Sequence, residues 1–153
     1  MDAALALKVG DEAPAFEAHD CEGRALSLAE FRGKKKVVLF FFPRAFTVRC
    51  VEEDRNFRDH YERIVAAGGE LLGVSTDHSA RNCEFKLKEQ LQFRLIGDDA
   101  HTLTKLYGVE WVELKASRRV TFVIDEGGVI IELIDQELLV DQHLSGVLKA
   151  LAA

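Results

Sequence analysis

Residues 37–50 read VVLFFFPRAFTVRC, and this stretch decides how the chain folds. Its first six residues are all apolar, which predicts a buried strand. A polar, helix-forming segment, EEDRNFRD, follows at residues 52–59. Cys50 therefore lies where a core strand gives way to a helix. Unpaired backbone N–H groups and the positive end of a helix dipole favour an anion there, so we expect the Cys50 thiol to ionise more readily than a free one.

The composition indicates a globular protein. The chain has 153 residues, of which 48% are hydrophobic and 30% charged, and it contains no linker-like stretch, so we expect a single domain over residues 1–153. A net charge of −6 argues against nucleic acid or an anionic membrane as a partner. No segment reaches the length of a membrane helix, and residues 2–7 lack the features of a signal peptide, so we expect a cytoplasmic protein.

Cysteine and histidine spacing speaks against a metal centre. Three cysteines without a Cys-x-x-Cys pair indicate neither a zinc site nor a disulfide framework. The five histidines are scattered, and Asp98-Asp99 is more simply a helix start than a metal site. Because no glycine-rich loop with phosphate-binding spacing follows a strand, we expect no nucleotide, and no cofactor or metal of any kind.

The order of the predicted elements indicates an α/β fold. Hydrophobic periodicity and turn residues predict strands at 15–19, 25–28, 37–42, 70–75, 93–96, 119–125 and 129–134, and helices at 48–67, 77–90, from about 99 to 108 and 138–152. This order predicts a mixed sheet with helices on both faces. Chemistry gathers at the carboxyl ends of parallel strands, and Cys50 falls at such an end.

Pro43, Thr47 and Cys50 form a Pro-x-x-x-Thr-x-x-Cys pattern after the apolar strand. This pattern resembles the peroxidatic motif of the peroxiredoxins of the AhpC/TSA superfamily, above all the PrxQ or bacterioferritin comigratory protein group. Residues 43–47 also resemble the one-cysteine alkyl hydroperoxide reductase E type. Further segments that resemble the family are 9–16, 57–59, 72–77 and 119–125. The resemblance implies a thioredoxin-like fold with an N-terminal β-hairpin extension and a central mixed sheet flanked by helices.

The resemblance also implies roles for five residues. Cys50 would be the thiolate that attacks the peroxide and becomes a sulfenic acid. Thr47 would hydrogen-bond the thiolate and the peroxide, and Arg119 would hold the thiolate charged. Pro43 would shield the thiolate from water, and Glu53 would order the network around the arginine. The implied activity is reduction of hydrogen peroxide and organic hydroperoxides, with recycling by thioredoxin or a similar thiol donor.

The other two cysteines depart from the family pattern. PrxQ proteins often carry a second cysteine five residues after the first, where this chain has Arg55. Cys83 lies on the predicted helix 77–90, about one turn before the usual alternative position, which here is Lys86. Cys83 is either the resolving thiol, reached after local unwinding around Cys50, or a buried filler. Cys21 lies in a turn, and we expect it to be an exposed bystander.

Several readings stay open on the sequence alone. Arg49 is either an exposed side chain at a helix start or an extra positive charge that lowers the pKa of Cys50. Phe46 is either a core residue or the lining of an apolar pocket for organic hydroperoxides. Besides the leading peroxidase hypothesis, two alternatives stay open: a thiol–disulfide oxidoreductase, which the absence of Cys-x-x-Cys disfavours, and a non-enzymatic redox sensor or holdase chaperone. The PrxQ resemblance favours a monomer, and the reductase E resemblance favours a small homodimer.

Overall fold

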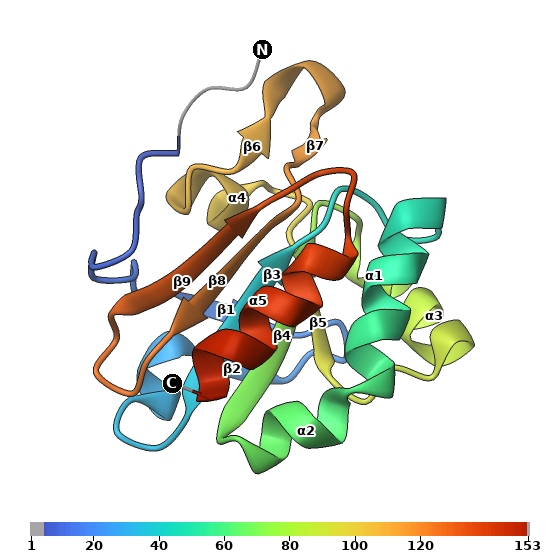
Figure 1. Ribbon diagram of the computed structural model, residues 1–153. Helices are drawn as coiled ribbons and strands as arrows, with labels where there is room; N and C mark the ends of the chain where they lie inside the picture. Colours follow the sequence, from blue (N-terminus) through green and yellow to red (C-terminus); the bar gives the residue numbers. More distant parts are fainter. Residues whose placement is uncertain (1–4, 153) are drawn as a thin grey trace.

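A five-stranded sheet forms the centre of the computed structural model, which describes residues 5–152 (Figure 1). Its strands lie in the order β5-β4-β3-β8-β9. They are β3 (Lys36–Phe41), β4 (Gly69–Ser75), β5 (Arg94–Gly97), β8 (Val120–Ile124) and β9 (Ile130–Asp135). Strands β3, β4 and β5 run parallel, whereas β8 is antiparallel to β3 and β9 is antiparallel to β8. The predicted mixed sheet is confirmed.

The helices are α1 (Val48–Asp59), α2 (Tyr61–Ala66), α3 (Ser79–Glu89), α4 (Thr102–Leu106) and α5 (Asp141–Ala152), with short 3-10 helices η1 (Leu28–Phe31) and η2 (Val112–Leu114). The single helix predicted over 48–67 is wrong, because the chain breaks at His60 between α1 and α2. The His60 ring Nδ1 lies 3.0 Å from the Asn56 carbonyl oxygen, which an uninterrupted helix would satisfy with a backbone N–H. No helix within residues 5–152 is long and apolar enough to cross a membrane.

Side chains of β3 alternate between two apolar layers, as a strand buried on both faces requires. Val37, Leu39 and Phe41 face a cluster that includes residues of α4, η1 and the N-terminal segment. Val38 and Phe40 face the other cluster, which includes residues of α1, α2, α3 and α5. Figure 1 shows α1 and α5 lying across one face of the sheet. The prediction of helices on both faces is therefore confirmed.

Two small hairpins form separate two-stranded sheets. Strands β1 (Glu17–His19) and β2 (Ala25–Ser27) pair antiparallel, as the sequence predicts. Strands β6 (Glu110–Trp111) and β7 (Ala116–Ser117) form a second hairpin around η2 that the sequence analysis missed. Strands of two residues are too short to leave an alternating pattern, so this hairpin had no signal in the sequence.

The sheet topology brings two distant segments to one end. Antiparallel pairing sets Phe41, the last residue of β3, opposite Val120, the first residue of β8. The loop that leads to Cys50 leaves that end of β3, and Arg119 immediately precedes β8. The end of β4 lies beside the same loop, because β3 and β4 are parallel neighbours.

Candidate active site

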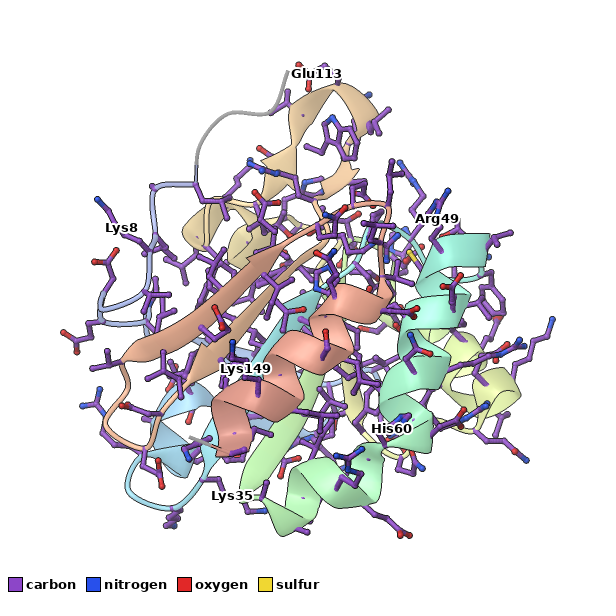
Figure 2. The ribbon with its side chains drawn as sticks, in the orientation of Figure 1. Lys8, Lys35, Arg49, His60, Glu113 and Lys149 are labelled. Atoms are coloured by element: carbon purple, nitrogen blue, oxygen red, sulfur yellow. A yellow bond between two sulfur atoms is a disulfide. The ribbon has the colours of Figure 1, made fainter. Side chains whose placement is uncertain are left out.

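Cys50 is the third residue of α1 and is fully buried, with 0% of its surface exposed. The guanidinium of Arg119 approaches its sulfur, with Nη2 3.4 Å from Sγ. Figure 2 labels the neighbouring Arg49 at the start of α1, on the outside of the molecule. The structure thus brings together the two predicted residues on which thiolate chemistry depends.

All three nitrogens of the Arg119 guanidinium are engaged. Nη1 donates to Glu53 Oε1 at 2.7 Å, and Nε donates to the carbonyl oxygen and Oε2 of Glu137 at 3.1 and 3.0 Å. Burial works against the charge, but Glu53 and Cys50 outweigh it and raise the pKa of Arg119. A permanent positive charge, held in a fixed orientation, therefore faces the Cys50 sulfur. Glu53 and Glu137 thus hold the Arg119 side chain from two sides, and Glu137 was not expected from the sequence.

Burial changes the expected acidity of Cys50. It raises the pKa of the thiol above its ordinary value, while the charge of Arg119, the Thr47 hydroxyl and the Arg44 backbone lower it without cancelling the burial. The prediction of a readily ionised thiol is therefore not met in this closed arrangement. The physical reason is desolvation: the sequence shows the charge and the helix terminus, but not that the sulfur is sealed from water.

A short loop, residues 42–47, connects β3 to α1. Pro43 is half-buried near its start, and Thr47 is the N-cap residue at its end. The Thr47 hydroxyl donates to the Arg44 carbonyl at 2.9 Å, and within the described residues it caps no helix N–H. The Thr47 hydroxyl also lies close enough to Cys50 to lower the pKa of the thiol.

Asp77 fastens this loop from the neighbouring strand. Its Oδ2 accepts hydrogen bonds from the Ala45 backbone N–H and from the Ser75 hydroxyl, both at 2.7 Å. The sequence predicted that the next helix begins at residue 77, but the N-cap of α3 is His78. The positioning role of Asp77 follows from the adjacency of β3 and β4, which no spacing in the sequence reveals.

Phe46 has a left-handed backbone, with φ at 66°. Its ring lies 5.1 Å from that of Phe85, centroid to centroid, and the Arg81 guanidinium covers it at 4.8 Å. These contacts favour the reading of Phe46 as a packing residue. Arg49 is exposed and donates to the Leu138 carbonyl at 3.0 Å, as expected of a side chain at a helix start.

Two further carboxyl groups lie beneath the site on α1. Burial raises the pKa of Glu53 to about 7, against the lowering effect of Arg119. Burial and the nearby Glu53 charge raise the pKa of Asp54 well above its usual value. Among residues 5–152, neither oxygen of Asp54 has a hydrogen-bond partner. The sequence analysis did not single out Asp54, because an acidic residue in a polar helix ordinarily faces solvent.

His143 closes the network from α5. Burial lowers the pKa of His143 to about 4, so the ring is neutral near pH 7. Nε2 lies 2.6 Å from the Gln136 carbonyl oxygen, and Nδ1 lies 2.7 Å from the Thr121 hydroxyl. A carbonyl only accepts, so the proton is on Nε2, and Nδ1 accepts from Thr121. The contact of 3.5 Å between Nδ1 and Glu53 Oε2 is therefore not an ion pair at neutral pH.

The pairing of the other cysteines differs from expectation. Cys21 and Cys83 form a disulfide, with their Cα atoms 5.5 Å apart, and Cys50 is free. The expectation that Cys21 is a bystander is wrong. The turn that carries Cys21 lies against β5, because its backbone N–H donates to the Leu95 carbonyl at 2.7 Å, and this places it beside α3. Whether Cys83 also resolves an oxidised Cys50 stays a prediction.

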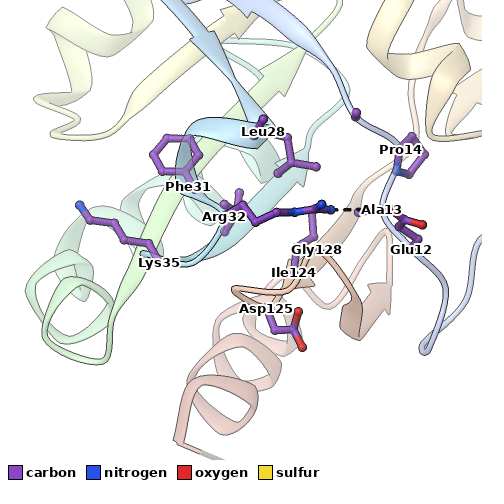
Figure 3. Close-up of a pocket in the computed structure, with 13 residues that line it drawn as sticks. Glu12, Ala13, Pro14, Leu28, Phe31, Arg32, Lys35, Ile124, Asp125 and Gly128 are labelled. Atoms are coloured by element: carbon purple, nitrogen blue, oxygen red, sulfur yellow. Dashed lines mark ion pairs between the residues drawn. The ribbon is translucent and has the colours of Figure 1, made fainter.

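Two cavities differ in their relation to the site. One of about 420 Å³, shown in Figure 3, is lined by Glu12, Arg32, Lys35 and Asp125 among others. It lies where β3 begins and β8 ends, at the far end of the sheet from Cys50. A hollow of about 350 Å³ is lined by Trp111, Arg119 and Glu137 and opens on the arginine side of the site. Within residues 5–152, no group of three or more histidine, cysteine or acidic side chains is placed to hold a metal ion.

The model of the AhpC/TSA family matches residues 9–133. The chain belongs to this family. Among curated peroxiredoxins, it is 36% identical over 144 residues to peroxiredoxin Q of rice (japonica), which carries the description chloroplastic; the match covers 93% of this chain and 65% of that protein. It is 33% identical over 144 residues to peroxiredoxin Bcp of Escherichia coli K12, covering 90% and 91%. The chain thus spans about two thirds of the rice protein and nearly all of the bacterial one.

Solved peroxiredoxin structures share the fold. Peroxidoxin BcpB of Mycobacterium tuberculosis superposes with a TM-score of 0.88 at 30% identity, covering 95% of this chain and 97% of that one. The predicted peroxiredoxin resemblance and the thioredoxin-like fold are both confirmed.

Proposed function

We propose that this peroxiredoxin is a thiol peroxidase that reduces hydroperoxides with Cys50 as its nucleophile. The observation that carries the proposal is the contact of 3.4 Å between the Arg119 guanidinium and the buried Cys50 sulfur. It is made in a chain whose curated relatives are named peroxiredoxins. A fixed cation beside a nucleophilic sulfur is what stabilises both the thiolate and the negative charge that develops on the leaving oxygen.

The chemistry needs only side chains of this chain and the peroxide. The Cys50 thiolate attacks one peroxide oxygen, the O–O bond breaks, and water or an alcohol leaves after taking up a proton. Cys50 becomes a sulfenic acid. Thr47 can turn its hydroxyl from the Arg44 carbonyl to the peroxide, since the hydroxyl carries a single hydrogen that serves one acceptor at a time.

Supporting residues set the geometry and exclude water. Glu53 and Glu137 hold Arg119 in place from two sides. Pro43 and the loop that follows it limit access of water to the Cys50 sulfur. Water therefore does not compete with the sulfur for the Arg119 guanidinium.

Recycling requires a thiol donor, and we assign this role to thioredoxin or a similar dithiol protein. A cytoplasmic location suits an enzyme that depends on such donors, although the rice relative is described as chloroplastic. We propose that the chain acts as a single domain and as a monomer or small homodimer, and sedimentation would distinguish the two states.

Stopped-flow kinetics test the proposal directly. Fully reduced protein is mixed with hydrogen peroxide or with cumene hydroperoxide, and the rate of peroxide loss is compared with that of free cysteine at the same pH. We expect the protein to react faster by at least about a thousandfold, and to turn over when thioredoxin and its reductase are supplied. A rate no greater than that of free cysteine would refute peroxidase function, and a single oxidation without turnover would favour a redox sensor.

A further inference from the structure

The Cys21–Cys83 disulfide lies outside the Cys50 site, and the chemistry proposed above leaves Cys21 unused. Cys21 is in the turn between β1 and β2, and Cys83 is in α3. Both are half-buried, whereas Cys50 is fully buried. In a reducing compartment, a disulfide at partly exposed positions is typically one that forms and breaks during function.

Noncovalent contacts hold this turn in place without help from the sulfur–sulfur bond. The Cys21 backbone N–H donates to the Leu95 carbonyl of β5 at 2.7 Å. Glu22 Oε1 lies 2.8 Å from Lys86 Nζ of α3, which bridges the turn to the helix. Neither contact involves the sulfur atoms, so we expect both to persist when the disulfide is reduced. The two thiols therefore stay within reach, and the bond can form repeatedly.

The segment that carries Cys50 contacts α3 at two places, one in the loop before α1 and one within α1. Before Cys50, the Phe46 ring packs on Phe85 with centroids 5.1 Å apart. After Cys50, Arg55 Nε lies 2.6 Å from Glu89 Oε1. The segment that carries Cys50 is thus held against α3 before and after that residue. Cys83 lies on a different face of α3, toward Cys21, so the Cys50 sulfur reaches it only after this part of the chain unwinds.

Within the described part of the chain, the first turn of α1 has no side-chain cap and one exposed apolar residue, so we infer that it unwinds to bring the Cys50 sulfur out. Val48 is 83% exposed, and the Thr47 side chain bonds to the loop instead of the helix. The left-handed backbone of Phe46, with φ at 66°, stores strain next to this turn. Unwinding three residues lengthens their span from about 4.5 Å in the helix to about 10 Å in an extended chain, a gain of about 6 Å.

We propose that the three cysteines form a relay in which Cys21 is the final thiol to be oxidised; this rests on the proposed function of Cys50. Peroxide first converts the Cys50 thiolate into a sulfenic acid. The Cys83 thiolate then attacks the Cys50 sulfur, forming a Cys50–Cys83 disulfide and releasing hydroxide, which leaves as water. The Cys21 thiolate next attacks the Cys83 sulfur, so that a Cys21–Cys83 disulfide forms and Cys50 departs as a thiolate.

A reductant can reach the Cys21–Cys83 disulfide at the surface, whereas it cannot reach the buried Cys50. Cys83 lines a groove of about 450 Å³ together with Leu87 and Leu91. A thiolate of a dithiol protein attacks the Cys83 sulfur there, Cys21 leaves as a thiolate, and the second thiol of the donor completes the exchange. Cys50 has by then returned to its buried site. It can accept a second peroxide before the reductant arrives.

Peroxide stoichiometry without reductant tests the relay. Fully reduced wild type receives three equivalents of hydrogen peroxide, samples are quenched with an alkylating agent, and cysteine-containing peptides are mapped by mass. We expect rapid consumption of about two equivalents per chain, the first giving Cys21–Cys83 and the second a Cys50 sulfenic acid. For Cys21→Ser and Cys21→Ala we expect about one equivalent and a trapped Cys50–Cys83 disulfide. For Cys50→Ser we expect no rapid Cys21–Cys83 disulfide.

The outcomes separate the relay from the peroxidase function. A Cys21–Cys83 disulfide that forms in Cys50→Ser as fast as in wild type would overturn the relay and leave a structural bond. Consumption of about two equivalents by both Cys21 variants would also overturn it. If Cys50 of the wild type is oxidised rapidly in either case, peroxidase function stands. If wild type consumes no peroxide at Cys50, both proposals fail together.

Discussion

Cys50 and the Cys21–Cys83 pair lie on or beside neighbouring helices, yet their surroundings differ in kind. Cys50 is sealed from water and faces a buried cation that two carboxylates hold in place. The pair is half-exposed, and a surface ion pair between Glu22 and Lys86 lies next to it. The first setting controls the charge of a sulfur, and the second controls access to it. A peroxidase needs both, and this chain divides them between two places.

Replacing the proposed nucleophile, Cys50, should have the largest effect on the rate of peroxide reduction. We expect Cys50→Ser to lower the rate of peroxide reduction by at least about a thousandfold, because a serine hydroxyl is not ionised at neutral pH. Stopped-flow measurement of peroxide loss checks this. A variant that retains more than a tenth of the wild-type rate would move the nucleophile to one of the other cysteines.

Removing the buried cation should give the next largest effect. We expect Arg119→Met to lower the rate of the first oxidation by about a hundredfold, through loss of charge stabilisation at the leaving oxygen. It should also raise the pKa of the Cys50 thiol further, because Arg119 is the largest influence that lowers it. The pH dependence of Cys50 alkylation measures that shift.

Arg49→Met is the matched control, since Arg49 precedes Cys50 but is exposed. We expect its rate to stay within about twofold of wild type, as is usual for an exposed charge. A loss equal to that of Arg119→Met would mean that general positive charge, and not the buried contact, activates the sulfur.

A stability change should follow from the unpaired carboxyl beneath the site. We expect Asp54→Leu to raise the free energy of unfolding by about 1–4 kcal/mol, because it removes a buried polar group without partners. Urea unfolding measures this. Asp59→Leu, at the exposed end of the same helix, should change stability by no more than about 0.5 kcal/mol. Destabilisation by Asp54→Leu would show that the Asp54 carboxyl has hydrogen-bond partners in solution.

The same variant should alter the pH dependence of stability. Because the pKa of Asp54 is raised on folding, the folded protein holds a proton that the unfolded chain releases, so wild-type stability falls as pH rises above about 3.8. Glu53 acts in the same direction between 4.5 and about 7, and His143 acts in the opposite direction between about 4 and 6.5. The advantage of Asp54→Leu over wild type should therefore widen with pH. A constant advantage from pH 4 to 7 would contradict this account.

The smallest effect should come from the surface ion pair. We expect Lys86→Met to change the rate of Cys21–Cys83 disulfide formation by less than about twofold, because an exposed pair contributes little and the backbone bond from Cys21 to Leu95 still holds the turn. Alkylation-quench kinetics measure the rate. A tenfold loss would show that the turn depends on its charges.

Local patterns in the sequence reached most of the fold and the core of the site. The apolar run before Pro43 predicted the central strand. The family motif pointed to Cys50 and the segment 119–125 to Arg119, and pairing of β3 with β8 brings these two residues together. The features that the sequence did not predict depend on which side chains the tertiary fold buries. The sequence does not show that Cys50 is sealed or that Asp54 points inward. The partner of Cys83 was missed for the same reason, because it depends on where a short turn packs against β5.

The pairing of β3 with β8 also sets when the site can exist during synthesis. The parallel neighbour of β3, strand β4, follows soon after it in the sequence. Val120, which pairs with Phe41 of β3, is synthesised much later. Contacts between residues so distant in sequence form late, because loop closure must precede them. A nascent chain therefore displays Cys50 well before it acquires Arg119. Until β8 docks, the cysteine lacks its cation, and full peroxide reactivity arises only with completion of the sheet.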